Sequence, residues 1–160
     1  MRNISYLTVA ALILGALLTS CDKRNEIIKD DDSLIFSFHR GGSWVGLDEN
    51  LTINAGATHF SISYRDLQTS ERKSYETTVK TSIDQWNDLT KSFNLETFTK
   101  IGNGPCRACV DGFDELFSVI KDGTTYTFSN GDADEHYQQM KEFFDSILKQ
   151  VDYFESVAKY

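Results

Sequence analysis

The feature that most constrains the fold is an Asp-Gly pair, Asp122-Gly123, which lies between two runs of β-forming residues. Asp-Gly favours a two-residue type I′ turn, in which both central residues take positive φ. Such a turn fixes the register of the hairpin. The predicted cross-strand pairs are Ile120–Thr125, Val119–Tyr126 and Phe117–Phe128. Aromatic and β-branched side chains then share one face, as is typical of a sheet that packs on a core.

Before this hairpin, several short segments alternate apolar and polar residues, which indicates half-buried strands. The predicted strands are residues 34–40, 51–53, 59–65 and 75–80. The expected core positions are Leu34, Phe36 and Phe38 in the first strand and Tyr75, Thr77 and Val79 in the last. The connections are too short for a crossover helix, so we expect an antiparallel meander.

Two helices are predicted. Ser82 and Gln85 form a capping box, S-x-x-Q, at the start of the first helix, and Asn94 is expected to end it in the left-handed conformation. The apolar residues at helical spacing are Ile83, Trp86, Leu89 and Phe93 in this helix.

The last helix follows the acidic residues of segment 132–135, which complement the helix dipole. Its apolar stripe consists of Tyr137, Met140, Phe144, Ile147, Leu148, Val151 and Phe154, and its final turns, 151–160, are expected to overhang the sheet. The order of elements predicts an α+β fold: an antiparallel sheet, made of the meander and the C-terminal hairpin, with two helices packed on one face.

The N-terminal segment, residues 1–20, has the pattern of a secretory signal peptide, with Arg2 followed by an apolar run. Its end, Leu18-Thr-Ser-Cys21, resembles a bacterial lipobox, which predicts lipidation of Cys21 by palmitate-type chains. More than one acyl chain gives stable membrane anchoring. The alternative is an ordinary signal peptide with a chance cysteine.

Residues 21–33 are charged and lack an amphipathic period, so they predict a flexible acidic tether to a single domain, residues 34–160. The acidic cluster Asp30–Asp32 resembles the export tag of Bacteroidetes lipoproteins, although a solvated linker has the same composition. We therefore expect an outer-membrane lipoprotein on the periplasmic or the cell-surface side.

The composition supports a folded core, with 40% hydrophobic and 12% aromatic residues. The formal charge is −8, and Arg2 is the only charged residue among the first twenty. This acidic balance argues against nucleic acid as a partner. Because the chain has no G-x-S-x-G, H-E-x-x-H or phosphate-loop pattern, we expect neither an enzyme nor a cofactor or metal.

Cys106 and Cys109 form a C-x-x-C motif. In an exported chain such a pair favours a structural disulfide. Redox chemistry and zinc binding are the alternatives, but redox motifs usually start a helix and zinc needs two further ligands. The bridged segment would present Arg107 on a stiff bulge, either as a recognition element or as an ordinary surface arginine.

The segment 40–47, RGGSWVGL, is unusual for a surface loop because it combines three glycines with a tryptophan. Trp44 is a side chain of the kind found at interface hot spots, although it could instead fold back on the core. The segment resembles the R-S-G-G-F-A-G-I motif of emfourin-type inhibitors of thermolysin-like metalloproteases. The matching positions are Arg40, Gly42, Trp44, Gly46 and Leu47, whereas Gly41 and Ser43 depart from the motif.

This resemblance covers roughly residues 34–148, and the predicted anchor is similar to that of the potempins, which are inhibitor lipoproteins of Bacteroidetes. The resemblances imply a lipid-anchored, non-catalytic inhibitor of a secreted peptidase, expected to be a metallopeptidase. Its partner-binding residues would be Arg40, Gly42, Trp44, Gly46 and Arg107. The alternative is a generic envelope lipoprotein that binds a protein or a glycan.

Overall fold

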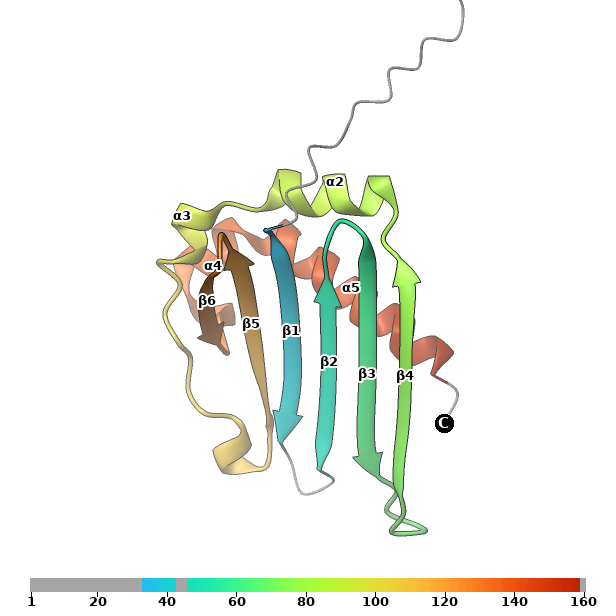
Figure 1. Ribbon diagram of the computed structural model, residues 1–160. Helices are drawn as coiled ribbons and strands as arrows, with labels where there is room; N and C mark the ends of the chain where they lie inside the picture. Colours follow the sequence, from blue (N-terminus) through green and yellow to red (C-terminus); the bar gives the residue numbers. More distant parts are fainter. Residues whose placement is uncertain (1–32, 43–45, 159–160) are drawn as a thin grey trace, which may run out of the picture. The chain divides into compact units, whose positions relative to one another are not determined.

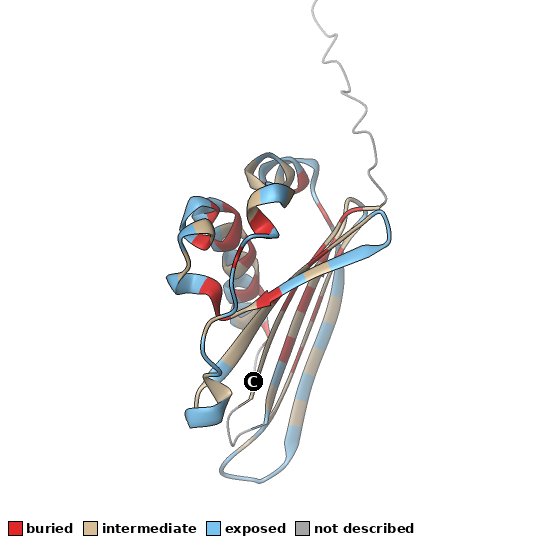
Figure 2. Cartoon of the chain, turned by 90° about the vertical axis from the view of Figure 1, so that its left-hand side faces the viewer, coloured by how far each residue is buried: buried red, intermediate tan, exposed pale blue. Residues whose placement is uncertain are grey.

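The computed structural model describes residues 33–42 and 46–158. These residues form a six-stranded antiparallel sheet with helices on one of its faces (Figures 1 and 2). The strands are β1 (Ile35–Gly42), β2 (Leu47–Ile53), β3 (Ala57–Arg65), β4 (Arg72–Lys80), β5 (Phe113–Lys121) and β6 (Thr124–Ser129). The helices are α2 (Ile83–Ser92), α3 (Leu95–Phe98), α4 (Glu135–Gln139) and α5 (Lys141–Val157), with 3-10 turns η1 (Ala108–Val110) and η2 (Gly131–Ala133).

The strand order is β4-β3-β2-β1-β5-β6, which confirms the predicted meander and hairpin and the α+β class. The hairpin turn has Asp122 at φ 51° and Gly123 at φ 76°, as a type I′ turn requires. The cross-strand pairs Ile120–Thr125, Val119–Tyr126 and Phe117–Phe128 are those predicted. The hairpin completes the sheet because β5 also pairs with β1.

The second strand is longer than the sequence predicts. β2 begins at Leu47 rather than at Leu51, and Leu47 pairs with Gly42 across the connection. The charged residues Asp48 and Glu49 obscure the alternation, yet Glu49 lies on the inner face and is fully buried. β2 therefore begins earlier in the chain than its alternation of apolar and polar residues predicts.

The core lies between the inner face of the sheet and the helices, and it is predominantly aromatic. Phe144 of α5 is fully buried, and its ring lies 4.8 Å from that of Phe117, 5.4 Å from that of Phe128 and 4.2 Å from that of Tyr137, measured between centroids. Edge-to-face and offset stacked rings of this kind add to the free energy of simple area burial.

The predicted last helix is in fact two helices. Met140 ends α4 and begins α5 with φ −107° and ψ 17°, and the side chain of Asp134 caps α4 by accepting a hydrogen bond from the backbone N–H of His136. The prediction that the final turns overhang the sheet holds only in part, because Tyr153 and Val157 are exposed whereas Val151 and Ala158 are buried. Phe154 is buried and its ring stacks on that of Phe60 in β3, 5.3 Å away.

The first helix also differs in detail from its prediction. Ser82 accepts a hydrogen bond from the backbone N–H of Gln85, but the Gln85 side chain donates to Thr58 Oγ1 in place of the reciprocal half of the capping box. Asn94 has φ −133°, so it does not end α2 in the left-handed region but caps the start of α3. Ile83 is 61% exposed because it lies on the outer side of α2.

The edge strand β4 is less covered than predicted. Tyr75 and Thr77 are half-buried, whereas Val79 is 42% exposed. β4 is an edge strand, and none of its residues is fully buried.

We expect Phe144→Ala to lower the free energy of unfolding by about 3–5 kcal/mol, because it empties the centre of the aromatic core. Tyr153→Ala on the same helix is the matched control. Since Tyr153 is 59% exposed, its loss should stay below about 1 kcal/mol. Urea denaturation of both variants measures the difference, and equal losses would show that the core is not centred on Phe144.

Candidate functional site

The loop end of the sheet is the end where β1 and β3 finish and β2, β4 and β5 begin. In Figure 2 the strands at this end extend past the helix layer. The end of β1 at Gly42, the β3–β4 turn and the segment between Cys106 and Gly112 lie here (Figure 1). The inner face of the sheet is therefore open beside these loops.

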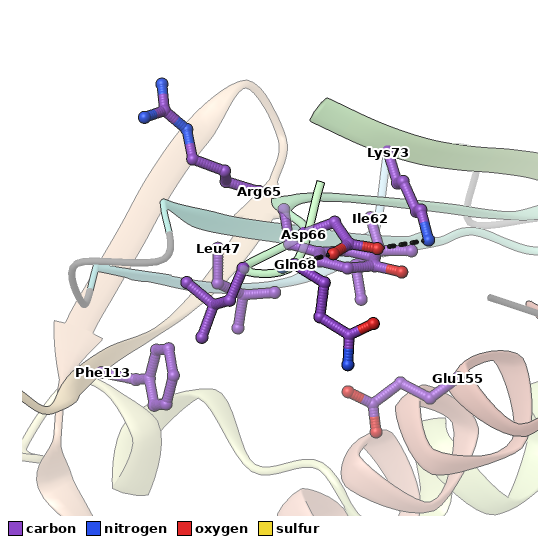
Figure 3. Close-up of a pocket in the computed structure, with 10 residues that line it drawn as sticks. Leu47, Ile62, Arg65, Asp66, Gln68, Lys73, Phe113 and Glu155 are labelled. Carbon is purple, nitrogen blue, oxygen red and sulfur yellow. Dashed lines mark hydrogen bonds and ion pairs between the residues drawn. The ribbon is translucent and has the colours of Figure 1, made fainter. Parts of the chain in front are cut away.

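An open pocket of about 600 Å³ lies on this uncovered part of the inner face (Figure 3). Its apolar lining residues are Leu47, Ile62, Tyr64, Leu67 and Phe113, and its polar ones are Arg65, Asp66, Gln68, Lys73 and Glu155. Four of the apolar residues come from inward-facing strand positions, Leu67 comes from the β3–β4 turn, and Glu155 comes from the last turns of α5. The volume is within the range of ligand-binding clefts.

Lys73 and Asp66 form an ion pair at one side of the pocket, with Lys73 Nζ 2.5 Å from Asp66 Oδ2. The hydrogen bond from Lys73, together with the backbone N–H groups of Thr69 and Gln68, lowers the pKa of Asp66 to about 2. The same contact raises the pKa of Lys73. The two charges therefore compensate each other within the pocket wall.

A group of carboxylates surrounds Arg40 next to the pocket. The guanidinium of Arg40 lies 3.0 Å from Glu49, 3.3 Å from Glu115 and 3.5 Å from Glu155. Arg40 and Glu115 lie on neighbouring inner-face positions of β1 and β5, and Glu155 reaches them from α5. We call Arg40, Glu49, Glu115 and Glu155 the acid cluster.

Glu49 is the buried member of the acid cluster. Its carboxyl is fully buried, and its Oε1 atom has no hydrogen-bond partner among the described residues. Burial, which is the largest effect, and the negative charge of Glu155 together raise the pKa of Glu49 to about 8, although the charge of Arg40 lowers it. Near neutral pH this carboxyl is therefore mostly protonated.

The segment between Cys106 and Gly112 is fixed at several points. Cys106 and Cys109 are joined, with Sγ atoms 2.01 Å apart, and both residues are exposed. Asp114 Oδ1 accepts hydrogen bonds from the backbone N–H groups of Arg107 and Ala108. Together with a hydrogen bond from Asn130, these contacts lower the pKa of the Asp114 carboxyl.

Asn130 connects this segment to the sheet. Its side chain accepts from the backbone N–H of Glu115 at 2.9 Å and donates to the Pro105 carbonyl at 2.9 Å and to Asp114 Oδ1 at 2.7 Å. Asn130 has φ 49°, and a Cβ on Gly104 would lie 1.8 Å from its carbonyl oxygen. The glycine thus permits the close approach of the two segments.

The structure brings together several of the residues that the sequence marks as partner-binding. Gly42 has φ 117°, and a Cβ there would lie 2.8 Å from Cβ of Ala108, so the end of β1 packs directly on the disulfide segment. Gly46 has φ 61° with open space around it. Trp44 lies outside the described residues, as does Cys21.

Arg40 and Arg107 have partners within the protein. Arg40 is held in the acid cluster and is only 20% exposed. Arg107 extends from the disulfide segment, and its guanidinium donates to Asp132 Oδ1 at 2.5 Å. This hydrogen bond raises the pKa of Arg107. Arg107 is thus a half-buried arginine whose guanidinium is held by Asp132.

Sequence reasoning missed Glu49, Glu115 and Glu155, which meet only in the folded structure. One signal could have found Glu49. The alternation of Leu51 and Ile53, continued two residues back, places Glu49 on the inner face.

No protein-family model matches this chain, and a search of curated proteins finds no match either. In the part of the chain that the structure describes, no helix is long and apolar enough to cross a membrane. The same residues contain no group of three or more His, Cys, Asp or Glu side chains arranged to hold a metal ion.

We expect Glu49→Gln to stabilise the protein at alkaline pH. The native state retains a proton on Glu49 that the unfolded chain releases, because the pKa rises from 4.5 to about 8 on folding. Wild-type stability therefore falls as the pH rises through that interval, and glutamine removes this loss. Urea denaturation should show an advantage of about 2–4 kcal/mol at pH 9 that shrinks towards pH 4.5. An advantage independent of pH, or equalled by the exposed-site variant Glu142→Gln, would contradict this account.

We expect the side chain of Asn130 to matter more for stability than the disulfide. Asn130→Ala removes three hydrogen bonds in a buried position and should cost about 2–4 kcal/mol. Replacing both Cys106 and Cys109 by serine should cost about 2 kcal/mol or less, since the bond closes a very short loop. Thermal and urea unfolding of the two variants decide the order, and a larger loss in the double serine variant would reverse it.

Proposed function

We propose that this protein is a lipid-anchored, non-catalytic inhibitor of a secreted peptidase, which it blocks with the loop end of its sheet. The observation that carries the proposal is the open pocket on the uncovered inner face, with exposed apolar side chains around it. Among the residues that line the pocket, Leu67 is 60% exposed and Phe113 is 37% exposed. Exposed apolar residues grouped at one place are typical of protein-binding surfaces.

The fixed geometry of the loop end also supports an inhibitory role. The disulfide, the hydrogen bonds of Asn130 and the contact of Gly42 with Ala108 tie the disulfide segment to β1 and β5. A segment that is already ordered loses less conformational entropy when it binds, which favours tight association. The choice of a peptidase as the partner rests on the resemblance of segment 40–47 to the emfourin motif.

A second candidate function is an envelope binding module for a glycan or another protein. The pocket favours it, because its volume suits a small ligand and aromatic side chains, Tyr64 and Phe113, are part of its lining. In that case the protein would bind without inhibiting any peptidase. The lipid anchor on Cys21 is common to both proposals.

The deciding experiment is titration of the chain from Asp22 onward into peptidases secreted by the organism that encodes it. Loss of peptidase activity at a ratio close to one to one supports inhibition. If every peptidase stays fully active while the chain binds an envelope glycan or protein, the binding module is correct and the inhibitor is not.

We expect Leu67→Ser to weaken inhibition at least about tenfold, as loss of a hot-spot side chain does. Ile83→Ser is the matched control. Ile83 is equally exposed, at 61%, and lies at the start of α2, at the opposite end of the sheet. Inhibition constants for the two variants test the location of the surface. Equal effects, or an effect of Ile83→Ser alone, would show that the loop end is not the contact.

A further inference from the structure

The pocket has an apolar side and an acidic side. Leu47 and Phe113 form the apolar side, and the carboxylate of Glu155 reaches into the pocket opposite them from the end of α5 (Figure 3). Gln68 extends from the β3–β4 turn towards Glu155. A ligand that fits this arrangement needs an apolar length and a polar end.

The cations that line the pocket leave the acidic side exposed. Lys73 is compensated by Asp66 at 2.5 Å, and Arg65 points away from the other lining side chains (Figure 3). Glu155 is 33% exposed, and its cationic neighbour is Arg40, at 3.5 Å. Because Arg40 is closer to Glu49 and Glu115, one guanidinium is shared by three carboxyl groups.

Glu49 also lacks a cation of its own within residues 33–42 and 46–158, because it shares Arg40 with Glu115 and Glu155. Burial and the negative charges of Glu155 and Asp152 raise the pKa of Glu49 to about 8, although Arg40 lowers it. Near neutral pH the Glu49 carboxyl is therefore neutralised by its own proton and not by a second cation. Its Oε1 atom is buried without a hydrogen-bond partner among the residues described. An additional cation beside Glu155 would lower the cost of ionising Glu49.

We propose that the pocket receives an arginine or lysine side chain of the protein partner. The aliphatic part of that side chain lies against Leu47 and Phe113, and its cationic end lies beside the Glu155 carboxylate. Arg and Lys suit such a site because their stems are apolar and only their ends are charged. This inference rests on the proposed function for the existence of a protein partner, but not for the chemistry of the pocket.

The test uses N-acetyl-arginine amide as the probe, with N-acetyl-citrulline amide as its neutral isostere. Nuclear magnetic resonance titration of the protein should show the arginine probe shifting the backbone signals of Leu47, Phe113 and Glu155. The citrulline probe should bind at least about tenfold more weakly, because a charge-assisted hydrogen bond is lost. Equal binding of the two probes, or shifts elsewhere in the domain, would overturn the proposal.

Glu155→Gln should weaken binding of the arginine probe about tenfold, whereas Glu142→Gln, an exposed site near the start of the same helix, should leave it unchanged. Phe113→Ala tests the apolar side independently of the acid cluster and should also weaken binding. If both pocket variants fold, as judged by their amide spectra, and both bind the probe normally, the assignment is wrong.

Binding should also depend on pH. The charged groups that face Glu49 are Arg40 from β1, Glu115 from β5, and Glu155 and Asp152 from α5. A cation in the pocket favours loss of the Glu49 proton, so affinity for the arginine probe should rise from pH 6 to pH 9. The rise should be absent in Glu49→Gln, and a rise of the same size in that variant would contradict the link.

The outcomes separate this inference from the proposed function. If the arginine probe binds in the pocket but no peptidase is inhibited, the pocket assignment stands and the inhibitor proposal fails. If a peptidase is inhibited and Leu67→Ser weakens inhibition, but the arginine probe does not bind, the loop end is the contact and the basic side chain is not its occupant.

Discussion

The pairing of β1 with β5 is the interaction on which the rest of the structure depends. β1 joins the meander to the C-terminal hairpin, because it pairs with β2 on one side and with β5 on the other. The register sets Phe38 opposite Phe117 and Gly42 opposite Phe113. The first pair builds the aromatic core under α5, and the second brings the disulfide segment to the end of β1. Core and loop end are thus positioned by the same ladder.

The sequence predicts the hairpin and its register well because both depend on neighbouring residues only. Asp122 and Gly123 favour the positive φ values of a type I′ turn, and this turn sets the register of the two strands. The sequence predicts the break at Met140 and the role of Asn94 poorly. At Met140 tertiary packing interrupts a continuous apolar stripe, and Asn94 could serve as the cap of either neighbouring helix. Asparagine is common in both positions, so its identity alone does not decide between them.

The candidate site was less predictable than the fold. The glycines of segment 40–47 and the cysteine pair indicated the end of the sheet at which the pocket lies, since Gly42 contacts the disulfide segment. The acid cluster could not be read from the sequence, because its members are separated by up to 115 positions and only the sheet register and α5 bring them together. Charged residues in strands are usually on the outer face, and Glu49 is an exception.

The course of β1 has a geometric consequence for the whole domain. Ser33, just before this strand, donates a hydrogen bond to Asp122 in the hairpin turn, whereas Gly42 lies at the loop end. A strand of 8 residues spans about 25 Å. The chain therefore enters at one extremity of the sheet and presents its pocket at the other. The proposed contact surface and the first described residue of the domain, Ser33, are thus separated by a full strand length.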